Sequence, residues 1–160
     1  MTKMQLLQQI IATLTADLAV LARAARTAHE AATHEECLPD NKYDTTALEA
    51  SYVAQGQANR AQEIRAALES YRALALQDFS EDAPIRLTAL VVLEDEIGCR
   101  RQVFLGPAAG GVKVVAGGCE TIVITPQSPL GRSLLGRVAG DELTSGTGEA
   151  AKTYTIVTIR

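Results

Sequence analysis

The sequence is poor in the residues that build disulfide frameworks, aromatic grooves and histidine-based active sites. Its 160 residues include three cysteines, two histidines, two phenylalanines, four tyrosines and no tryptophan. Cys37, Cys99 and Cys119 are odd in number, widely separated and free of any Cys-x-x-Cys pair, which argues against a disulfide framework or zinc ribbon and favours a reducing compartment. The scarcity of aromatic side chains argues against a peptide-binding groove.

The motifs of several enzyme classes are also missing. Gly-x-Ser-x-Gly is absent and the second half has no histidine, so no hydrolase triad is expected there. No Gly-Lys-Ser/Thr follows the glycines of 106–118, so we expect no phosphate loop and no nucleotide binding. His29 and His34 are five residues apart, not the four that place two zinc ligands on one helical face.

Long apolar runs and an excess of positive charge are absent too. No continuous run reaches the roughly 18 apolar residues of a membrane span, and Gln5, Gln8 and Gln9 interrupt the first apolar residues, unlike a signal peptide. The net charge of −4 gives no electrostatic reason to bind DNA or RNA directly. With 47% hydrophobic and 21% charged residues, we expect a folded cytoplasmic protein without membrane contact.

The first half has the apolar spacing of two long helices. Apolar residues recur at four-three intervals from Leu7 to Ala32 and again from Ala47 to Ala75, and Pro39 interrupts the segment between them. The short connection predicts an antiparallel coiled-coil hairpin. Leucine and isoleucine fill the predicted seam at one end and alanine at the other, so we expect the bend end to be thinner and less stable.

The second half has the short apolar runs and glycine turns of a small sheet domain. We predict strands at 85–93, 101–105, 112–115, 121–125 and 154–159, and a short helix at 129–135 that Ser128 caps, with Pro129 at its first position. The predicted fold class is α+β with two domains, an antiparallel helical hairpin and an antiparallel sheet with one short helix. The predicted boundaries are 1–76 for the hairpin with its acidic tip at about 34–45, 77–84 for a linker and 85–160 for the sheet domain.

The predicted bend is strongly acidic. Residues 30–49 carry six carboxylates against one base, Lys42; they are Glu30, Glu35, Glu36, Asp40, Asp44 and Glu49. One interpretation is a solvated loop in which Asp44 or Thr45 caps the second helix. The other is that the tip carboxylates bind a divalent ion, for which a partner would have to supply further ligands, because two or three exposed acids hold Mg²⁺ only weakly.

The segment Ile124-Thr125-Pro126-Gln127-Ser128-Pro129-Leu130-Gly131-Arg132-Ser133-Leu134-Leu135-Gly136, followed by Gly140-Asp141-Glu142, resembles the Gre (GreA/GreB) family of bacterial transcript cleavage factors. The segment 44–56 resembles the part of that family from the second tip acid to a Gln-Gly pair. The resemblance implies an FKBP-like second domain without isomerase activity, and RNA polymerase as the partner of a monomer.

The resemblance further implies that the hairpin enters the secondary channel of RNA polymerase, while Gln127, Ser128 and Pro129 dock at its rim. Asp40 and Asp44 would then help to hold a Mg²⁺ ion shared with the polymerase, which cleaves its own backtracked RNA. On this interpretation the chain is an auxiliary factor and not itself an enzyme.

Two tip residues depart from the family pattern. A gap-free alignment places neutral Asn41 at the first acid, with Asp40 beside it, and Asp44 where a glutamate is usual. One alternative is therefore a Gre-like regulator that occupies the channel without stimulating cleavage. A third hypothesis, from another class, is a coiled-coil adaptor whose FKBP-like domain binds peptides.

Overall fold

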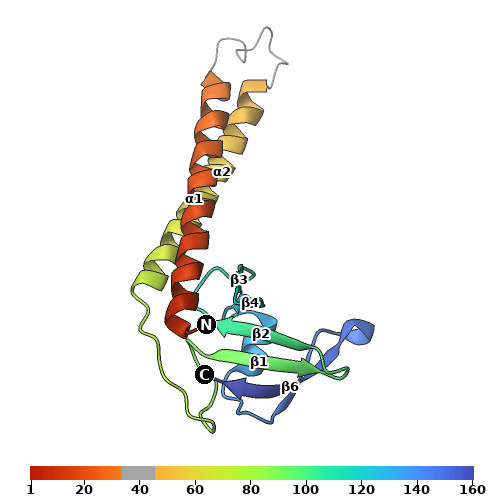
Figure 1. Ribbon diagram of the computed structural model, residues 1–160. Helices are drawn as coiled ribbons and strands as arrows, with labels where there is room; N and C mark the ends of the chain where they lie inside the picture. Colours follow the sequence, from red (N-terminus) through yellow and green to blue (C-terminus); the bar gives the residue numbers. More distant parts are fainter. Residues whose placement is uncertain (34–45) are drawn as a thin grey trace. The chain divides into compact units, whose positions relative to one another are not determined.

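A computed structural model describes residues 1–33 and 46–160 of the protein (Figure 1). Two long helices come first and a sheet follows, with a short helix and a 3-10 turn between its strands. The elements are α1 (Lys3–Thr33), α2 (Thr46–Arg72), β1 (Leu90–Asp95), β2 (Arg100–Leu105), β3 (Lys113–Ala116), β4 (Cys119–Ile124), α3 (Pro129–Leu134), β5 (Glu142–Ser145), η2 (Gly148–Ala150) and β6 (Lys152–Ile159).

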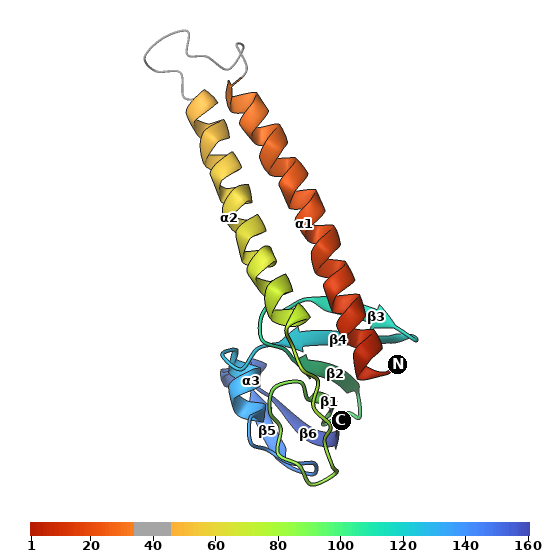
Figure 2. The ribbon, with the colours of Figure 1, turned by 90° about the vertical axis from the view of Figure 1, so that its left-hand side faces the viewer.

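The strands form one sheet in the order β3-β4-β2-β1-β6-β5. Four of its pairings are antiparallel, and β2 pairs with β4 in parallel. The α+β class is thereby confirmed, whereas the parallel pair was not predicted. A parallel pair needs a crossover of about a dozen residues. Residues 106–118 supply it, and they place β3 at the edge beyond β4 (Figure 2).

The strands β1 and β5 differ from the sequence prediction. The strand expected at 85–93 begins only at Leu90, because Thr88 has a left-handed backbone (φ 74°) that an extended strand cannot contain. The strand β5 was missed because Leu143 is its only apolar residue and its only buried one. Alternation is the signal that reveals a half-buried strand, and one apolar residue cannot provide it.

Both faces of the sheet are covered by apolar side chains. Val91 and Leu93 are alternate residues of β1, and both belong to the core cluster that also contains Leu134 of α3. Phe104 lies between cluster residues on β2, its partner Val123 precedes Ile124 on β4, and both are fully buried. Tyr71 of α2 lies near Val123 at Gly106, and we infer that the buried side chains of the helix ends, which belong to the same compact unit, cover this second face. These are Leu6, Leu7, Ile10 and Tyr71.

The chain divides into two compact units that differ from the predicted domain boundaries. The globular unit comprises Met1–Ile11 and Ser70–Arg160, and the hairpin unit comprises Ala12–Glu69. The first turns of α1 and the last turn of α2 thus belong to the globular unit. Burial explains this assignment, because Leu6, Ile10 and Tyr71 have no exposed surface.

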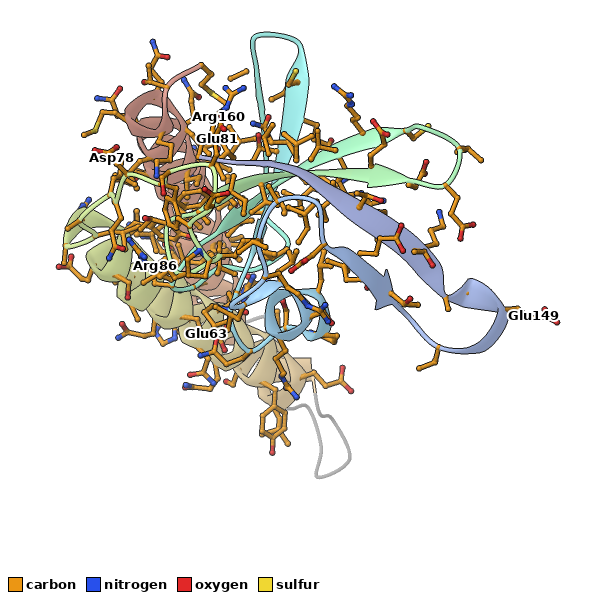
Figure 3. The ribbon with its side chains drawn as sticks, turned by 90° about the horizontal axis from the view of Figure 1, so that it is seen from below. Glu63, Asp78, Glu81, Arg86, Glu149 and Arg160 are labelled. Atoms are coloured by element: carbon orange, nitrogen blue, oxygen red, sulfur yellow. The ribbon has the colours of Figure 1, made fainter. Side chains whose placement is uncertain are left out.

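The segment after α2 contains no helix or strand up to Leu90, yet several contacts fasten it to the start of α1. Lys3 Nζ donates to the carbonyl oxygens of Gln77 and Thr88, and it lies 4.6 Å from the centre of the Phe79 ring. The guanidinium of Arg86 lies 5.0 Å from the same ring. Burial lowers the pKa of Lys3, and the charge of nearby Asp78 opposes that shift. Figure 3 labels Asp78 and Arg86 on this segment.

In the hairpin unit, α1 and α2 run side by side (Figures 1 and 2). Burial along the predicted seam decreases toward the bend. Leu14, Ile64 and Leu68 are buried, whereas Leu18 and Leu21 are half-buried. This gradient agrees with the expectation of weaker packing where alanine replaces leucine, because burying an alanine contributes less than the roughly 1.5–3 kcal/mol of a leucine.

A groove of about 430 Å³ lies along the two helices. Its lining residues are Ala22, Ala25, Arg26, Gln55, Ala58, Asn59, Ala61, Gln62 and Arg65. Two arginines and three amide side chains border this groove, so its rim is polar. The expectation that the helices approach more closely at the alanines nearer the bend stays a prediction.

By length and composition alone, the first helix could cross a membrane, although it contains no continuous run of about 18 apolar residues. Within the described residues, Lys3–Ala31 is long enough and has a window of mean hydropathy 1.3, with 22% of that window buried. Alanine-rich composition produces this value without a continuous apolar run. One such helix is weak evidence for a membrane span, because long helices of water-soluble proteins pass the same test.

Tyr71 joins the end of α2 to the loop after β2. Its hydroxyl donates to the carbonyl oxygen of Ala108 over 2.7 Å. Gly106 makes this approach possible, since a β-carbon there would collide with the Tyr71 hydroxyl and lie 3.2 Å from Val123 Cγ1. Burial raises the pKa of Tyr71 far above its ordinary value.

We expect Tyr71→Phe to lower the free energy of unfolding by about 1–2 kcal/mol at pH 7, because the buried Ala108 carbonyl loses its donor. The raised pKa adds a second expectation. The stabilising contribution of the neutral Tyr71 is complete below about pH 10 and is lost above it, where the unfolded tyrosine ionises first. Urea unfolding of the wild type and the variant at pH 7 and at a pH above 10 measures these effects.

Tyr52→Phe is the matched control, since Tyr52 is 69% exposed on α2. We expect it to change stability by less than about 0.5 kcal/mol. Equal effects of the two substitutions would show that the Tyr71 hydroxyl does not anchor the helix.

Candidate functional site

The two tip acids that the sequence singled out, Asp40 and Asp44, lie outside the residues that the structure describes. Their predicted role in holding Mg²⁺ therefore stays a prediction. Among residues 1–33 and 46–160, no group of three or more His, Cys, Asp or Glu side chains is placed to hold a metal ion. The described part of the candidate site is thus the segment around Gln127, Ser128 and Pro129.

This segment forms a hydrogen-bonded turn that leads into α3. The Ser128 hydroxyl donates to the Thr125 carbonyl over 2.7 Å and accepts from the Gly131 N–H over 3.0 Å. Ser128 is thereby the N-cap of the helix and Pro129 its first residue, as predicted. A proline costs nothing there, because the N–H at that position has no partner within the helix.

Gly131 is required by close packing. It is buried, and a β-carbon on it would collide with the Thr125 carbonyl. Any larger residue would push the turn away from the helix and break the two Ser128 hydrogen bonds. This collision explains why the motif has a glycine at position 131, two residues after Pro129.

The other end of α3 is fastened to the start of the sheet domain. Gly136 has φ +78°, and its N–H donates to the Ile85 carbonyl over 2.9 Å. The Ile85 N–H in turn donates to the Arg137 carbonyl over 2.8 Å. Only glycine adopts such a backbone without strain, which explains its place after the helix. Leu134 is fully buried and fixes the helix on the core.

The outer surface of this segment is positive and partly apolar. We define the docking strip as Gln127, Pro129, Arg132, Leu135 and Arg137, all of which are exposed. Residues 126–138 contain two arginines and no acidic residue. Arg132 Nε donates to the Gln127 carbonyl over 2.9 Å, which holds its guanidinium over the turn.

Arg132 and Arg137 were not singled out from the sequence as partner-binding residues. The sequence signal that could have found them is the absence of acid between Pro126 and Val138 in a chain whose net charge is −4. Asp141, in the acidic turn after the strip, accepts from the Val138 N–H over 3.0 Å. This carboxylate therefore closes a turn.

The chain matches no protein-family model, and no curated protein matches it. It is similar to solved structures of transcription factors. A structure of the transcription factor Gfh1 is 26% identical, with 93% of this chain and 92% of that chain covered and a TM-score of 0.41. The GreA factor homolog 1 (Gfh1) of Thermus thermophilus is 22% identical over 94% of both chains, with a TM-score of 0.40. The elongation factor GreA/GreB of Nitrosomonas europaea is 20% identical, with 60% of this chain and 78% of that chain covered and a TM-score of 0.37.

Superpositions with TM-scores near 0.4 carry no weight for function on their own. The motif residues Gln127, Ser128 and Pro129 and the local geometry that they adopt are the basis for the function proposed below.

We expect Ser128→Ala to destabilise the protein by about 1 kcal/mol, because the first turn of α3 loses its cap and the Thr125 carbonyl loses one of its two donors. Thermal unfolding measures the change. Ser133→Ala is the matched control in the same helix, since the Ser133 hydroxyl only donates to the Pro129 carbonyl within the helix. An equal loss in both variants would contradict the capping role of Ser128.

Proposed function

We propose that this chain is a Gre-like transcription factor that binds RNA polymerase through the docking strip and presents its hairpin to the secondary channel. The single observation that carries the proposal is the conformation of the Ser128-Pro129 segment. These motif residues form a capped turn over buried Gly131 and leave Gln127, Pro129 and Arg132 exposed. Residues that resemble a docking motif are thus accessible and rigidly held.

Charge supports a macromolecular partner with an acidic, partly apolar surface. The strip carries Arg132 and Arg137 without a neighbouring carboxylate from 126 to 138, although the whole chain is acidic. An exposed leucine, Leu135 at 40% exposure, adds apolar area beside them. Complementary charge of this kind increases the rate of association and fixes orientation more than it raises affinity.

The helices give the hairpin its reach. The 27 residues of α2 correspond to a rod of about 40 Å at 1.5 Å per residue. In the sequence, Asp40 and Asp44 lie between the two helices, which is the basis for proposing that the hairpin delivers them. A factor of this kind has no activity alone, because its carboxylates act only beside the groups that the polymerase supplies.

In the leading form of the proposal, the chain stimulates cleavage of backtracked RNA. Asp40 and Asp44 would offer carboxylate oxygens to a Mg²⁺ ion bound by the polymerase, and this ion, when bound, supplies activation of the attacking water. The protein's own part is to deliver and orient these two carboxylates. It is accordingly a cytoplasmic, bacterial protein that acts as a monomer.

A second form keeps the binding and drops the cleavage. It is favoured by neutral Asn41 at the position of the first acid and by an aspartate at position 44, whose side chain is shorter than that of glutamate. A displacement of about 1 Å at a reacting centre costs roughly a hundredfold in rate. In this form the hairpin occupies the channel and modulates transcription without hydrolysis.

Stalled elongation complexes with labelled backtracked RNA distinguish the two forms. Shortened RNA after addition of the protein supports the cleavage factor. Competition with a known channel binder without shortened RNA at any Mg²⁺ concentration supports the regulator. Failure to co-purify with core RNA polymerase would contradict both forms and favour the peptide-binding adaptor.

We expect Asp44→Asn to abolish stimulated cleavage and to change the affinity for RNA polymerase by no more than about threefold, because one neutralised carboxylate affects the reaction and not the docking strip. Single-turnover cleavage and a binding titration measure both quantities. Asp17→Asn, an exposed acid of α1, is the matched control and should cleave normally. Normal cleavage by Asp44→Asn would reduce Asp44 to a helix cap.

We expect Pro129→Ala to weaken binding to core RNA polymerase about tenfold while folding is retained, because it removes an exposed apolar contact from the docking strip and loosens the first turn of α3. Pro84→Ala, an exposed proline elsewhere in the globular unit, is the control and should bind as the wild type does. An unchanged affinity of Pro129→Ala would remove this segment from the interface.

A further inference from the structure

The globular unit contains a cleft that the proposed function does not use. It has a volume of about 700 Å³ and is bordered by the sheet, by the turn between β3 and β4 and by the first residue of the chain. We call it the β3–β4 cleft. Its lining residues are Met1, Val92, Arg100, Arg101, Gln102, Lys113, Ala116, Gly117, Gly118, Cys119, Glu120, Ile122 and Arg160. Binding sites for small molecules have volumes of about 300–1,000 Å³.

Four of these residues are basic and one is acidic. The basic side chains, Arg100, Arg101, Lys113 and Arg160, come from three parts of the chain that the sheet brings together. Figure 3 shows Arg160 at the end of β6 that is remote from Glu149. This concentration of positive charge contrasts with the net charge of −4 of the whole chain.

Three of the basic residues already have partners. The guanidinium of Arg101 lies 5.7 Å from the centre of the Tyr154 ring, so phosphate binding is assigned to the other three basic residues. Two of those three form exposed ion pairs. Arg100 Nε lies 2.7 Å from Glu94 Oε2, and Lys113 Nζ lies 3.1 Å from Glu120 Oε1. Each of these side chains is at least one third exposed. Surface ion pairs contribute only about 0–1 kcal/mol, so a ligand anion exchanges readily with the carboxylates.

The wall and floor of the cleft suit a ligand with an apolar body. Gly117 and Gly118 form a two-residue turn with φ of +61° and +80°, and nothing lies within 4 Å of the β-carbon that either would carry. This turn presents bare backbone to the ligand. Val92 and Ile122 are half-buried and line the cleft between the charged groups.

We propose that the β3–β4 cleft binds a nucleoside polyphosphate, with the phosphates on the basic side chains and the base over Val92 and Ile122. Guanidinium groups pair with phosphate oxygens in a fork and also stack on flat rings, so arginines serve both ends of such a ligand. The proposal departs from the expectation of no nucleotide binding, which rested on the missing phosphate loop. In this cleft, side-chain charge and not a glycine-rich helix start would hold the phosphates.

A small ligand agrees with the cleft better than a nucleic acid chain does. The basic residues of the lining all border one cleft, and the net negative charge of the chain disfavours an extended polyanion. The inference does not depend on RNA polymerase binding, since it concerns residues outside the docking strip.

Isothermal titration of the full chain with ATP and with GTP tests the proposal. We expect saturable binding by the wild type that weakens at higher salt, and at least about tenfold weaker binding by the double variant Arg100→Gln/Lys113→Gln, which loses two charged hydrogen-bond donors. Arg60→Gln is the matched control, because Arg60 forms an equally exposed ion pair with Glu63 at 2.8 Å in the hairpin unit. Its affinity should equal that of the wild type.

Ala116→Glu, which adds an acid to the lining without removing a contact, should weaken binding to a similar degree. In NMR spectra, the amide signals of Gly117 and Gly118 should shift on titration, while those of the docking strip stay in place. Pyrophosphate should bind at least about tenfold more weakly than ATP if the base contributes.

Several results would overturn the proposal. These are the absence of saturable binding up to millimolar ATP and GTP, an equal loss of affinity in Arg60→Gln and the double variant, pyrophosphate binding as tight as that of ATP, and tighter binding of an RNA oligomer than of either nucleotide. Circular dichroism of each variant separates loss of the site from loss of the fold.

Discussion

The structure depends above all on the burial of the helix ends against the sheet. Tyr71 is the largest of these side chains, and its hydroxyl donates to the Ala108 carbonyl. Gly106 leaves space for the ring, while Leu6 and Ile10 bring the start of α1 into the same unit. The start of α1, the end of α2 and the sheet therefore belong to one compact unit.

Local features of the fold could be predicted from the sequence, because their causes lie within a few residues. Ser128 and Pro129 specify a helix start whatever lies around them, and Gly136 specifies its end. The long helices follow from spacing alone. The parallel pairing of β2 with β4 could not be predicted in this way, since it depends on the position of β3 at the edge of the sheet. The left-handed backbone of Thr88 is another such case, because a β-branched residue adopts it only when surrounding contacts enforce it.

The candidate sites show the same division. The Gln127–Pro129 turn was found from its motif, but the interpretation of Arg132 and Arg137 as surface residues beside it required their exposure to be known. The β3–β4 cleft has no sequence signature at all. Arg100 and Arg160 are far apart in the chain and come together because β2, β1 and β6 are neighbours in the sheet. Charged residues that the sheet topology brings together cannot be recognised from their spacing in the sequence.

The groove along α1 and α2 has a consequence for mutational tolerance. Ala25 is half-buried and Ala58 is exposed at this groove, so neither contributes much apolar burial to folding. Substitutions there should change the free energy of unfolding much less than substitutions at buried Leu14 or Leu68, which leaves the surface of this part of the hairpin free to vary.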